Sequence, residues 1–305
     1  MKESTQVSVA FSMSTLTRRR CFAMTLGAVV GQGGFFSASA KALEAEKNHR
    51  DLRFQIGEGF GEGLSENIEA VLRSSAETIW RHCTSTQWQI AGFSIYQHEQ
   101  YPICHFDHTA DSCVSIGLAT KQTFWAQYAF QFAHEFCHAL IGHTGDWRKR
   151  NLRQPGPNFW LEECLCEVAS LFSLRAMSEA WQSQPPYPNW KEYADHLNSY
   201  ADERIENTRK AYLLPFSSWF AEVENDLRKN PTMREHNCRI ALELLPIFEA
   251  EPVGWDSLQH YRMMVPSEEQ RLQEHFEQWF LAADRTQHTF IRKIGTVFGV
   301  KIAQK

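Results

Sequence analysis

The sequence has no block of Lys or Arg of the kind that lines a nucleic-acid groove. Its 31 basic and 36 acidic residues are mixed along the chain and give a net charge of −5, which argues against a nucleic-acid partner. Low-complexity tracts and internal repeats are also absent, and 22% charged residues with 43% hydrophobic residues exclude wholesale disorder. A chain of 305 residues with this composition can build one large domain or two lobes.

Long apolar runs are absent after the first forty residues, so we expect no stable membrane span in the mature chain. The first forty residues have the layout of an export signal: three arginines at 18–20, an apolar run at 21–36 and Ala-Ser-Ala at 38–40. The arginines and the Cys-Phe that follows resemble a twin-arginine signal. We expect residues 1–40 to direct bacterial export to the periplasm or medium, and an uncleaved anchor is the alternative.

Seven cysteines follow this signal, and an odd number leaves at least one outside any set of pairs. Cys104 and Cys113 flank a polar segment between two predicted strands, so we expect them to form a disulfide. The same segment contains His105, Asp107 and His108, which makes a second metal site the alternative interpretation.

The motif His-Glu-Phe-Cys-His at 134–138 lies within a strongly apolar segment that we predict to be a helix from Thr123 to Gly142. His134 and His138 would lie about 6 Å apart along the axis and about 40° apart around it, so both imidazoles can reach one zinc ion. Glu135 can reach the open position, where water binds, and act as the general base. The competing interpretation is a polar helix face turned to water.

The next predicted helix begins with Trp-Leu-Glu-Glu at 160–163. Together with the motif at 134–138, this segment resembles the gluzincins, the zinc peptidases that include thermolysin and the M1 aminopeptidases. In many of them a downstream Trp-Leu-x-Glu provides the third ligand. The resemblance implies that Glu163 is a ligand and that Glu167 hydrogen-bonds His134 and fixes its tautomer. Glu162 is expected to be a solvated neighbour.

The chain departs from the related patterns in several places. Cys164 stands where the aminopeptidases usually have Gly, and no Gly-x-Met-Glu-Asn precedes the motif, so aminopeptidase specificity is not implied. A metzincin would need Gly and His where Ile141 and Thr144 stand, and His143 is expected just past the helix end. Three cysteines near the motif are expected to be core residues rather than ligands: Cys137, Cys164 and Cys166.

Two further expectations come from the gluzincin resemblance. The predicted strand at 113–118 occupies the place where an edge strand pairs with extended substrate, although an ordinary buried strand is the equal alternative. A Tyr or His from the helical lobe usually stabilises the oxyanion, and the candidates are Tyr200, Tyr212, His236 and Tyr261.

Strands are predicted at 52–56, 90–96 and 113–118, with a polar loop at 105–112, and helices punctuated by prolines dominate afterwards. We therefore expect an α+β fold with a small sheet and zinc-binding helices in a catalytic core at 50–180. A mostly helical C-terminal lobe would follow at 181–305. The expected activity is peptide-bond hydrolysis with one Zn²⁺ and a peptide or protein substrate. The alternatives are a zinc-dependent amidohydrolase of another substrate class, and a non-catalytic helical binding or scaffold protein that retains a zinc site.

Overall fold

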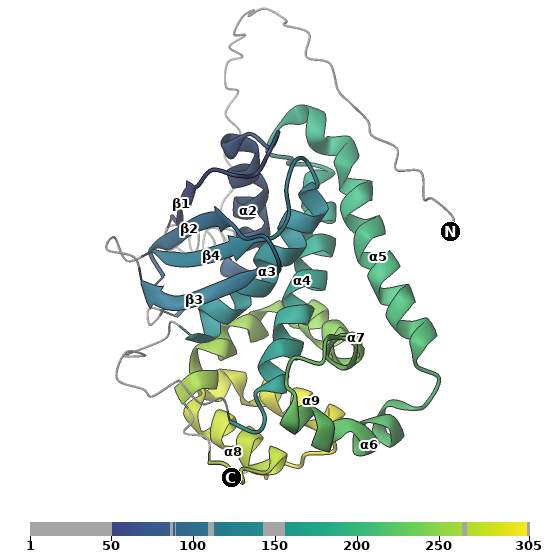
Figure 1. Ribbon diagram of the computed structural model, residues 1–305. Coiled ribbons are helices and arrows are strands. Elements are labelled where there is room, and N and C mark those ends of the chain that lie inside the picture. The colour runs from purple at the N-terminus through teal and green to yellow at the C-terminus, as the bar shows by residue number, and fades with distance from the viewer. Residues whose placement is uncertain are drawn as a thin grey trace, which may run out of the picture. The chain divides into compact units, whose positions relative to one another are not determined.

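The computed structural model describes residues 51–85, 88, 90–108, 113–142, 156–263 and 267–303 (Figure 1). The predicted export signal at 1–40 and His143 lie outside these residues. The described residues include four strands, which are β1 (Arg53–Ile56), β2 (Gly92–Gln97), β3 (Ile103–His108) and β4 (Val114–Leu118). The α-helices are α2 (Ser65–Trp80), α3 (Trp125–Gly142), α4 (Trp160–Trp181), α5 (Ala194–Ala211), α6 (Phe216–Lys229), α7 (Arg234–Ala250), α8 (Leu272–Ala282) and α9 (His288–Val297). The same part of the chain also contains the 3₁₀ segments η2 (Pro188–Tyr193), η3 (Pro252–Met263) and η4 (Arg285–Gln287).

The strands form one mixed sheet in the order β1-β2-β4-β3. β1 and β2 pair in parallel, as do β2 and β4, whereas β3 pairs antiparallel with β4 and carries an irregularity between His105 and His108. β3 is therefore an edge strand, and β4 lies between two neighbours. Of the two alternatives for the strand at 113–118, the buried strand is the one observed, because β3 overlaps the segment predicted as a polar loop and pairs with β4 on its outer side.

One face of α3 packs on the sheet through aromatic rings. Phe132 and Phe136 contact Phe93 of β2 edge to face, with ring centroids 5.3 and 5.4 Å apart, and Phe132 also contacts Phe54 of β1. Two residues further along a helix lie about 200° around its axis. His134 and His138 therefore face away from the sheet, toward α4.

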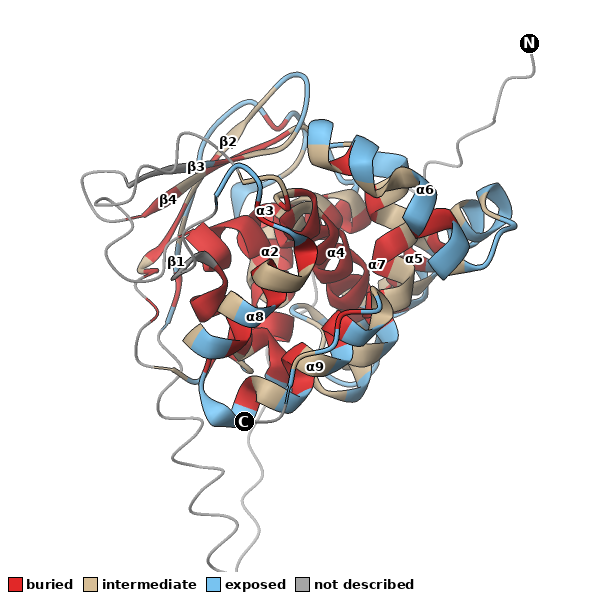
Figure 2. Cartoon of the chain, turned by 90° about the horizontal axis from the view of Figure 1, so that it is seen from below, coloured by how far each residue is buried: buried red, intermediate tan, exposed pale blue. Residues whose placement is uncertain are grey.

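Helix α4 lies at the centre of the molecule and packs against α2, α3, α5 and α7. Small hydroxyl side chains allow the close approach: Ser75 of α2 lies 2.9 Å from Ser173, oxygen to oxygen, and Ser170 donates to the Phe130 carbonyl of α3 at 2.9 Å. Figure 2 shows the buried residues gathered on α2, α3, α4 and α7. One continuous hydrophobic core joins the sheet to the C-terminal helices.

The fold is α+β and mostly helical, as the sequence predicts, and the three predicted strands are present. The predicted disulfide is not: Cys104 and Cys113 both carry thiols. The register of the β3–β4 hairpin explains the difference, because it sets Cys104 opposite Ile116 rather than Cys113. Within the described ranges, no helix combines the length and the apolar character that a membrane crossing requires.

Candidate metal centre

Helices α3 and α4 bring the two predicted histidine ligands onto one carboxylate. His134 Nε2 lies 3.5 Å from Glu163 Oε2, and His138 Nε2 lies 3.6 Å from Glu163 Oε1. Both distances are longer than a well-formed hydrogen bond. A tetrahedral ion with bonds of about 2.1 Å places its ligand atoms about 3.4 Å apart. Spacings of this size are compatible with a shared metal ion bound by the two imidazoles and by one or both oxygens of Glu163.

Cys166 is a second neighbour of the histidines. Its Sγ and a ring nitrogen from each of His134 and His138 lie within 4.8 Å of one another, so these residues form a group that could hold a metal ion. Cys166 follows Glu163 by three residues, which places both on the same face of α4. It is fully buried in the core, as the sequence predicts, but its position near both rings makes it a competitor of Glu163 for the third ligand position.

Two further carboxylates lie behind the histidine rings. Glu162 Oε1 accepts a hydrogen bond from His138 Nδ1 at 2.8 Å, and Glu162 is only 1% exposed. The expectation of a solvated Glu162 is wrong: α3 and α4 run antiparallel, so the first turn of α4 lies beside the later histidine of α3. Glu167 faces His134 as predicted, but at 3.8 Å from Nδ1 it is beyond hydrogen-bond length.

Burial and neighbouring charges shift the pKa values of the candidate ligands in opposite directions. For Glu163, burial raises the pKa, but the contacts with His134 and His138 outweigh burial and hold it well below its ordinary value. Burial lowers the pKa of His138, yet Glu162 and Glu163 raise it well above its ordinary value. Burial raises the pKa of the Cys166 thiol well above its ordinary value, and Cys137 raises it further. The neighbouring charges thus favour the ionised form of Glu163, whereas burial disfavours the thiolate of Cys166.

Glu135 lies between the histidines and the edge of the sheet. It is 4% exposed, and its carboxylate accepts a hydrogen bond from the backbone N–H of Cys104 in β3. Burial raises the pKa of Glu135, and the two histidines only partly offset this, so the pKa stays above its ordinary value. A buried carboxylate with a raised pKa can both accept and return a proton near neutral pH.

A cleft of about 340 Å³ opens onto these residues. His134, Glu135, Glu163 and Glu167 line it on the side of α3 and α4. The other side is formed mainly by α5, α7 and the residues just before α7; the lining residues there include Tyr200, Arg204, Thr232, Arg234 and Asn237. Helices α5 and α7, with the residues just before α7, therefore supply one wall of the candidate site.

Of the four predicted oxyanion candidates, Tyr200 lines this cleft. Tyr212 and His236 do not, and their side chains hydrogen-bond each other at 3.0 Å. Tyr261 is buried, with its hydroxyl 3.1 Å from His275 Nε2. Sequence reasoning missed Arg204 and Arg234, and no local pattern could have found them, because only the packing of α5 and α7 against α4 brings them to the motif.

The alternative second metal site at 104–113 is not supported by the residues that the structure describes there. Cys104 is buried, whereas His105 is exposed and its Nε2 lies 2.7 Å from the Tyr96 hydroxyl. Consecutive strand residues point to opposite faces of a sheet, so these two do not converge. The side chains of Asp107 and His108 lie outside the described residues.

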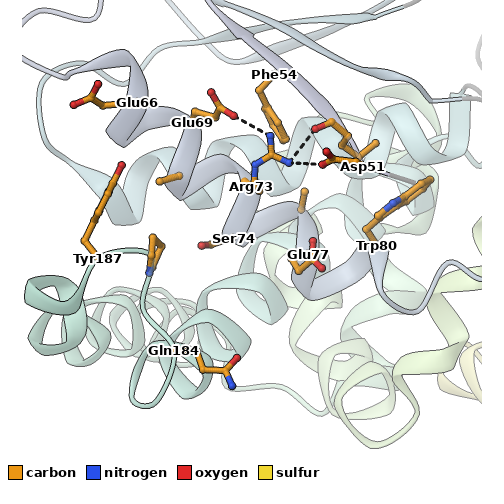
Figure 3. A pocket seen from close by; sticks show the side chains of 14 residues that line it. Asp51, Phe54, Glu66, Glu69, Arg73, Ser74, Glu77, Trp80, Gln184 and Tyr187 are labelled. Atoms are coloured by element: carbon orange, nitrogen blue, oxygen red, sulfur yellow. Dashed lines mark hydrogen bonds and ion pairs between the residues drawn. The ribbon is translucent and has the colours of Figure 1, made fainter. Parts of the chain in front are cut away.

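A larger hollow of about 790 Å³ lies elsewhere, beside α2 and the turn that follows α4 (Figure 3). Neither histidine nor cysteine lines it. Its one cation, Arg73, already pairs with Asp51 at 3.0 Å and Glu69 at 2.8 Å. Although this hollow is larger, it therefore lacks the candidate metal ligands that line the smaller cleft.

No family model, curated protein or solved structure matches the chain. The functional interpretation therefore depends on the geometry of the site.

Proposed function

We propose that the protein is a zinc-dependent metallopeptidase in which His134, His138 and Glu163 hold the ion. The observation that carries the proposal is the spacing of 3.5 and 3.6 Å between the two Nε2 atoms and the Glu163 oxygens. Glu163 is favoured over Cys166 because it lines the cleft, whereas Cys166 is fully buried and does not. A ligand that lines the cleft leaves the ion accessible from the cleft, and a catalytic zinc ion needs this access because it keeps one coordination position for water or substrate.

Zinc, when bound, polarises a carbonyl and brings the pKa of a water molecule near neutrality. Glu135 lies in the same cleft, and we assign it the role of general base. Its carboxylate takes a proton from the attacking water and then delivers it to the leaving amine. The Cys104 N–H holds this carboxylate against β3, which restricts the orientations it can adopt.

Tyr200 is our choice for stabilising the oxyanion. Its hydroxyl oxygen accepts a hydrogen bond from the Arg204 guanidinium. The hydroxyl proton therefore remains available to be donated to a negatively charged oxygen in the cleft.

The edge strand β3 is our choice for binding the substrate backbone. Within the described residues it pairs with β4 along one side only, and its Cys104 touches the proposed base. The outer side of an edge strand can pair with an extended peptide and so hold it with little dependence on sequence.

The two rival functions differ from this one in a testable way. A purely structural zinc site takes four closed ligands and needs no base, whereas here a buried carboxylate lies in an open cleft beside the two histidines. That arrangement disfavours a scaffold without turnover. An amidohydrolase of another substrate class would use the same residues, so only the choice of substrate separates it from a peptidase.

The decisive experiment combines metal analysis with cleavage of a mixed peptide library by the wild-type protein and Glu135→Gln. The amide of glutamine cannot take up the proton, so turnover should fall at least about 100-fold while zinc stays near one equivalent. Glu179→Gln, which changes an exposed glutamate on α4, is the matched control and should stay active. An active Glu135→Gln would contradict the assignment of the base. A wild-type protein with one zinc and no peptide cleavage would favour the rivals.

A further inference from the structure

Arg204 of α5 is a cation in the metal cleft without a carboxylate partner in the described part of the chain. Its guanidinium carbon lies 4.2 Å from the ring centroid of Phe130 and 4.4 Å from that of Tyr200. Both distances are within the range of about 6 Å for cation–π contacts, so both rings contact the guanidinium. Arg204 Nε is buried and has no hydrogen-bond acceptor among the described residues. A buried donor without an acceptor is uncommon in native proteins.

Arg234 lines the same cleft but differs from Arg204 in having an acidic partner and a largely exposed side chain. Its Nε is 3.5 Å from Glu167 Oε1, and its side chain is 61% exposed. Glu167 therefore offsets part of its charge, and the exposed remainder is free to turn toward a ligand. Arg204 is the fixed cation of the pair and Arg234 the adaptable one.

The charges that line the cleft favour an anionic ligand once an ion is bound. Glu135, Glu163 and Glu167 face Arg204 and Arg234. With a divalent ion in place, these three carboxylates and two guanidinium groups leave the cleft with one net positive charge. The volume of about 340 Å³ is near the lower end of small-ligand sites, so a short segment with an anionic group fits better than a long stretch of chain.

We propose that Arg204, assisted by Arg234, binds a carboxylate of the substrate. The protein would then act on short peptides that carry either a free C-terminal carboxylate or an acidic side chain near the scissile bond. The planar fork of an arginine matches both oxygens of a carboxylate, which gives a charged and directional contact. This inference rests on the proposed peptidase function and adds its substrate class. Arg204 is a specificity residue in it, with Phe130 and Tyr200 holding the guanidinium in place.

The test uses two sets of N-acetylated hexapeptides in matched pairs. One set ends in a free carboxylate or in an amide, and the other contains glutamate or glutamine at otherwise identical positions. Cleavage gives kcat and KM for the zinc-loaded wild type and for Arg204→Ala, Arg204→Lys and Arg209→Ala. Arg209 is on the same helix outside the cleft and pairs with Glu206, so Arg209→Ala removes an equal charge as a control. Calorimetric binding of the same peptides to Glu135→Gln, with and without Arg204→Ala, measures recognition without turnover.

We expect one matched set to show a KM about 10- to 100-fold lower for its carboxylate member, in line with a hydrogen-bonded charged group. Arg204→Ala should abolish this preference, so that the two members of the set have KM values within about 2-fold of each other. Any loss through the missing hydrogen bond to Tyr200 should affect both members equally. Arg204→Lys should retain only part of the preference, because it keeps the charge but loses the fork. The set that discriminates identifies the carboxylate as terminal or as a side chain. Arg209→Ala should behave as the wild type.

Equal KM values within both sets would overturn the inference and leave the peptidase function intact. So would an Arg204→Ala effect of the same size on carboxylate and neutral peptides, which would mean that Arg204 only supports the fold. If the wild type cleaves no peptide but Glu135→Gln still prefers the carboxylate members, the peptidase function fails and the carboxylate site stands. If nothing is cleaved and nothing binds, both fail. Should Arg204→Ala not fold, Arg204→Lys decides the same comparisons.

Discussion

At 2.8 Å, the contact between His138 Nδ1 and Glu162 Oε1 is the shortest between the two histidines and the carboxylates of α4. It sets the orientation of the ring. With Nδ1–H donated to Glu162, Nε2 faces Glu163 and is the ring nitrogen that would bind a metal ion. His134 has a weaker counterpart, because Glu167 lies 3.8 Å from its Nδ1.

This asymmetry predicts that Glu162→Ala weakens zinc binding about 10- to 100-fold, as the loss of a partner behind a ligand typically does. Glu162→Gln should lose less, since its amide oxygen can still accept from Nδ1. The sequence alone predicts that Glu167→Gln also weakens zinc binding about 10- to 100-fold. The longer contact of Glu167 with His134 now predicts that a substitution at Glu167 weakens zinc binding less than one at Glu162. Competition with a chromogenic chelator measures the affinities. Equal affinities for the wild type and Glu162→Ala would show that the contact does not orient His138.

The choice between Glu163 and Cys166 as third ligand gives a second prediction. Glu163→Ala should lose zinc and activity together, because it removes one of three bonds to the ion. Cys166→Ala should keep about one equivalent of zinc, since it removes a fully buried side chain that does not line the cleft. Elemental analysis of both purified proteins, beside the wild type, measures the stoichiometry. Zinc retained in Glu163→Ala and lost in Cys166→Ala would make Cys166 the ligand.

The parts of the site that follow from helix geometry could be predicted from the sequence. A spacing of four residues places His134 and His138 on one face, and the alternation of aromatic residues indicates that the opposite face is buried. β3 was missed because His105 and His108 make the segment polar, although an edge strand can present one face to water.

The parts that depend on how helices cross could not be predicted. Glu162 and Glu163 are adjacent in sequence, and which of them faces which histidine is set by the antiparallel packing of α3 on α4. Arg204 and Arg234 follow the motif by many residues and join the site through α5 and α7. Neither residue has a local pattern that distinguishes it from other surface arginines.

A third prediction concerns the start of the mature chain. We propose that residues 1–40 are an export signal and are removed after Ala40, because Ala-Ser-Ala at 38–40 has the small residues that a signal peptidase requires. N-terminal sequencing of the exported protein should therefore begin near Lys41. A chain that starts at Met1 outside the cytoplasm would instead support an uncleaved anchor.

The fourth prediction concerns stability in acid. His275 is 6% exposed, with Nε2 at 3.1 Å from the Tyr261 hydroxyl and Nδ1 at 3.3 Å from Gln270 Oε1. Burial lowers the pKa of His275 from 6.5 to about 4, although Glu162 acts in the opposite direction. The unfolded chain therefore takes up a proton on this side chain below about pH 6.5, whereas the folded protein does so only near pH 4.

The contribution of His275 to the free energy of unfolding is consequently largest above pH 6.5 and falls as the pH falls toward 4. The linkage relation gives a loss of about 2 kcal/mol between pH 8 and pH 5. His275→Gln keeps a polar side chain that does not titrate, so its unfolding free energy should change less between these two pH values, by about the same 2 kcal/mol. Urea unfolding at both pH values measures the difference, with His196→Gln on the exposed side of α5 as the control. If His275→Gln and the wild type lose equal stability on acidification, the side chain is already protonated in the folded protein at pH 5, or its burial has no effect on the pKa.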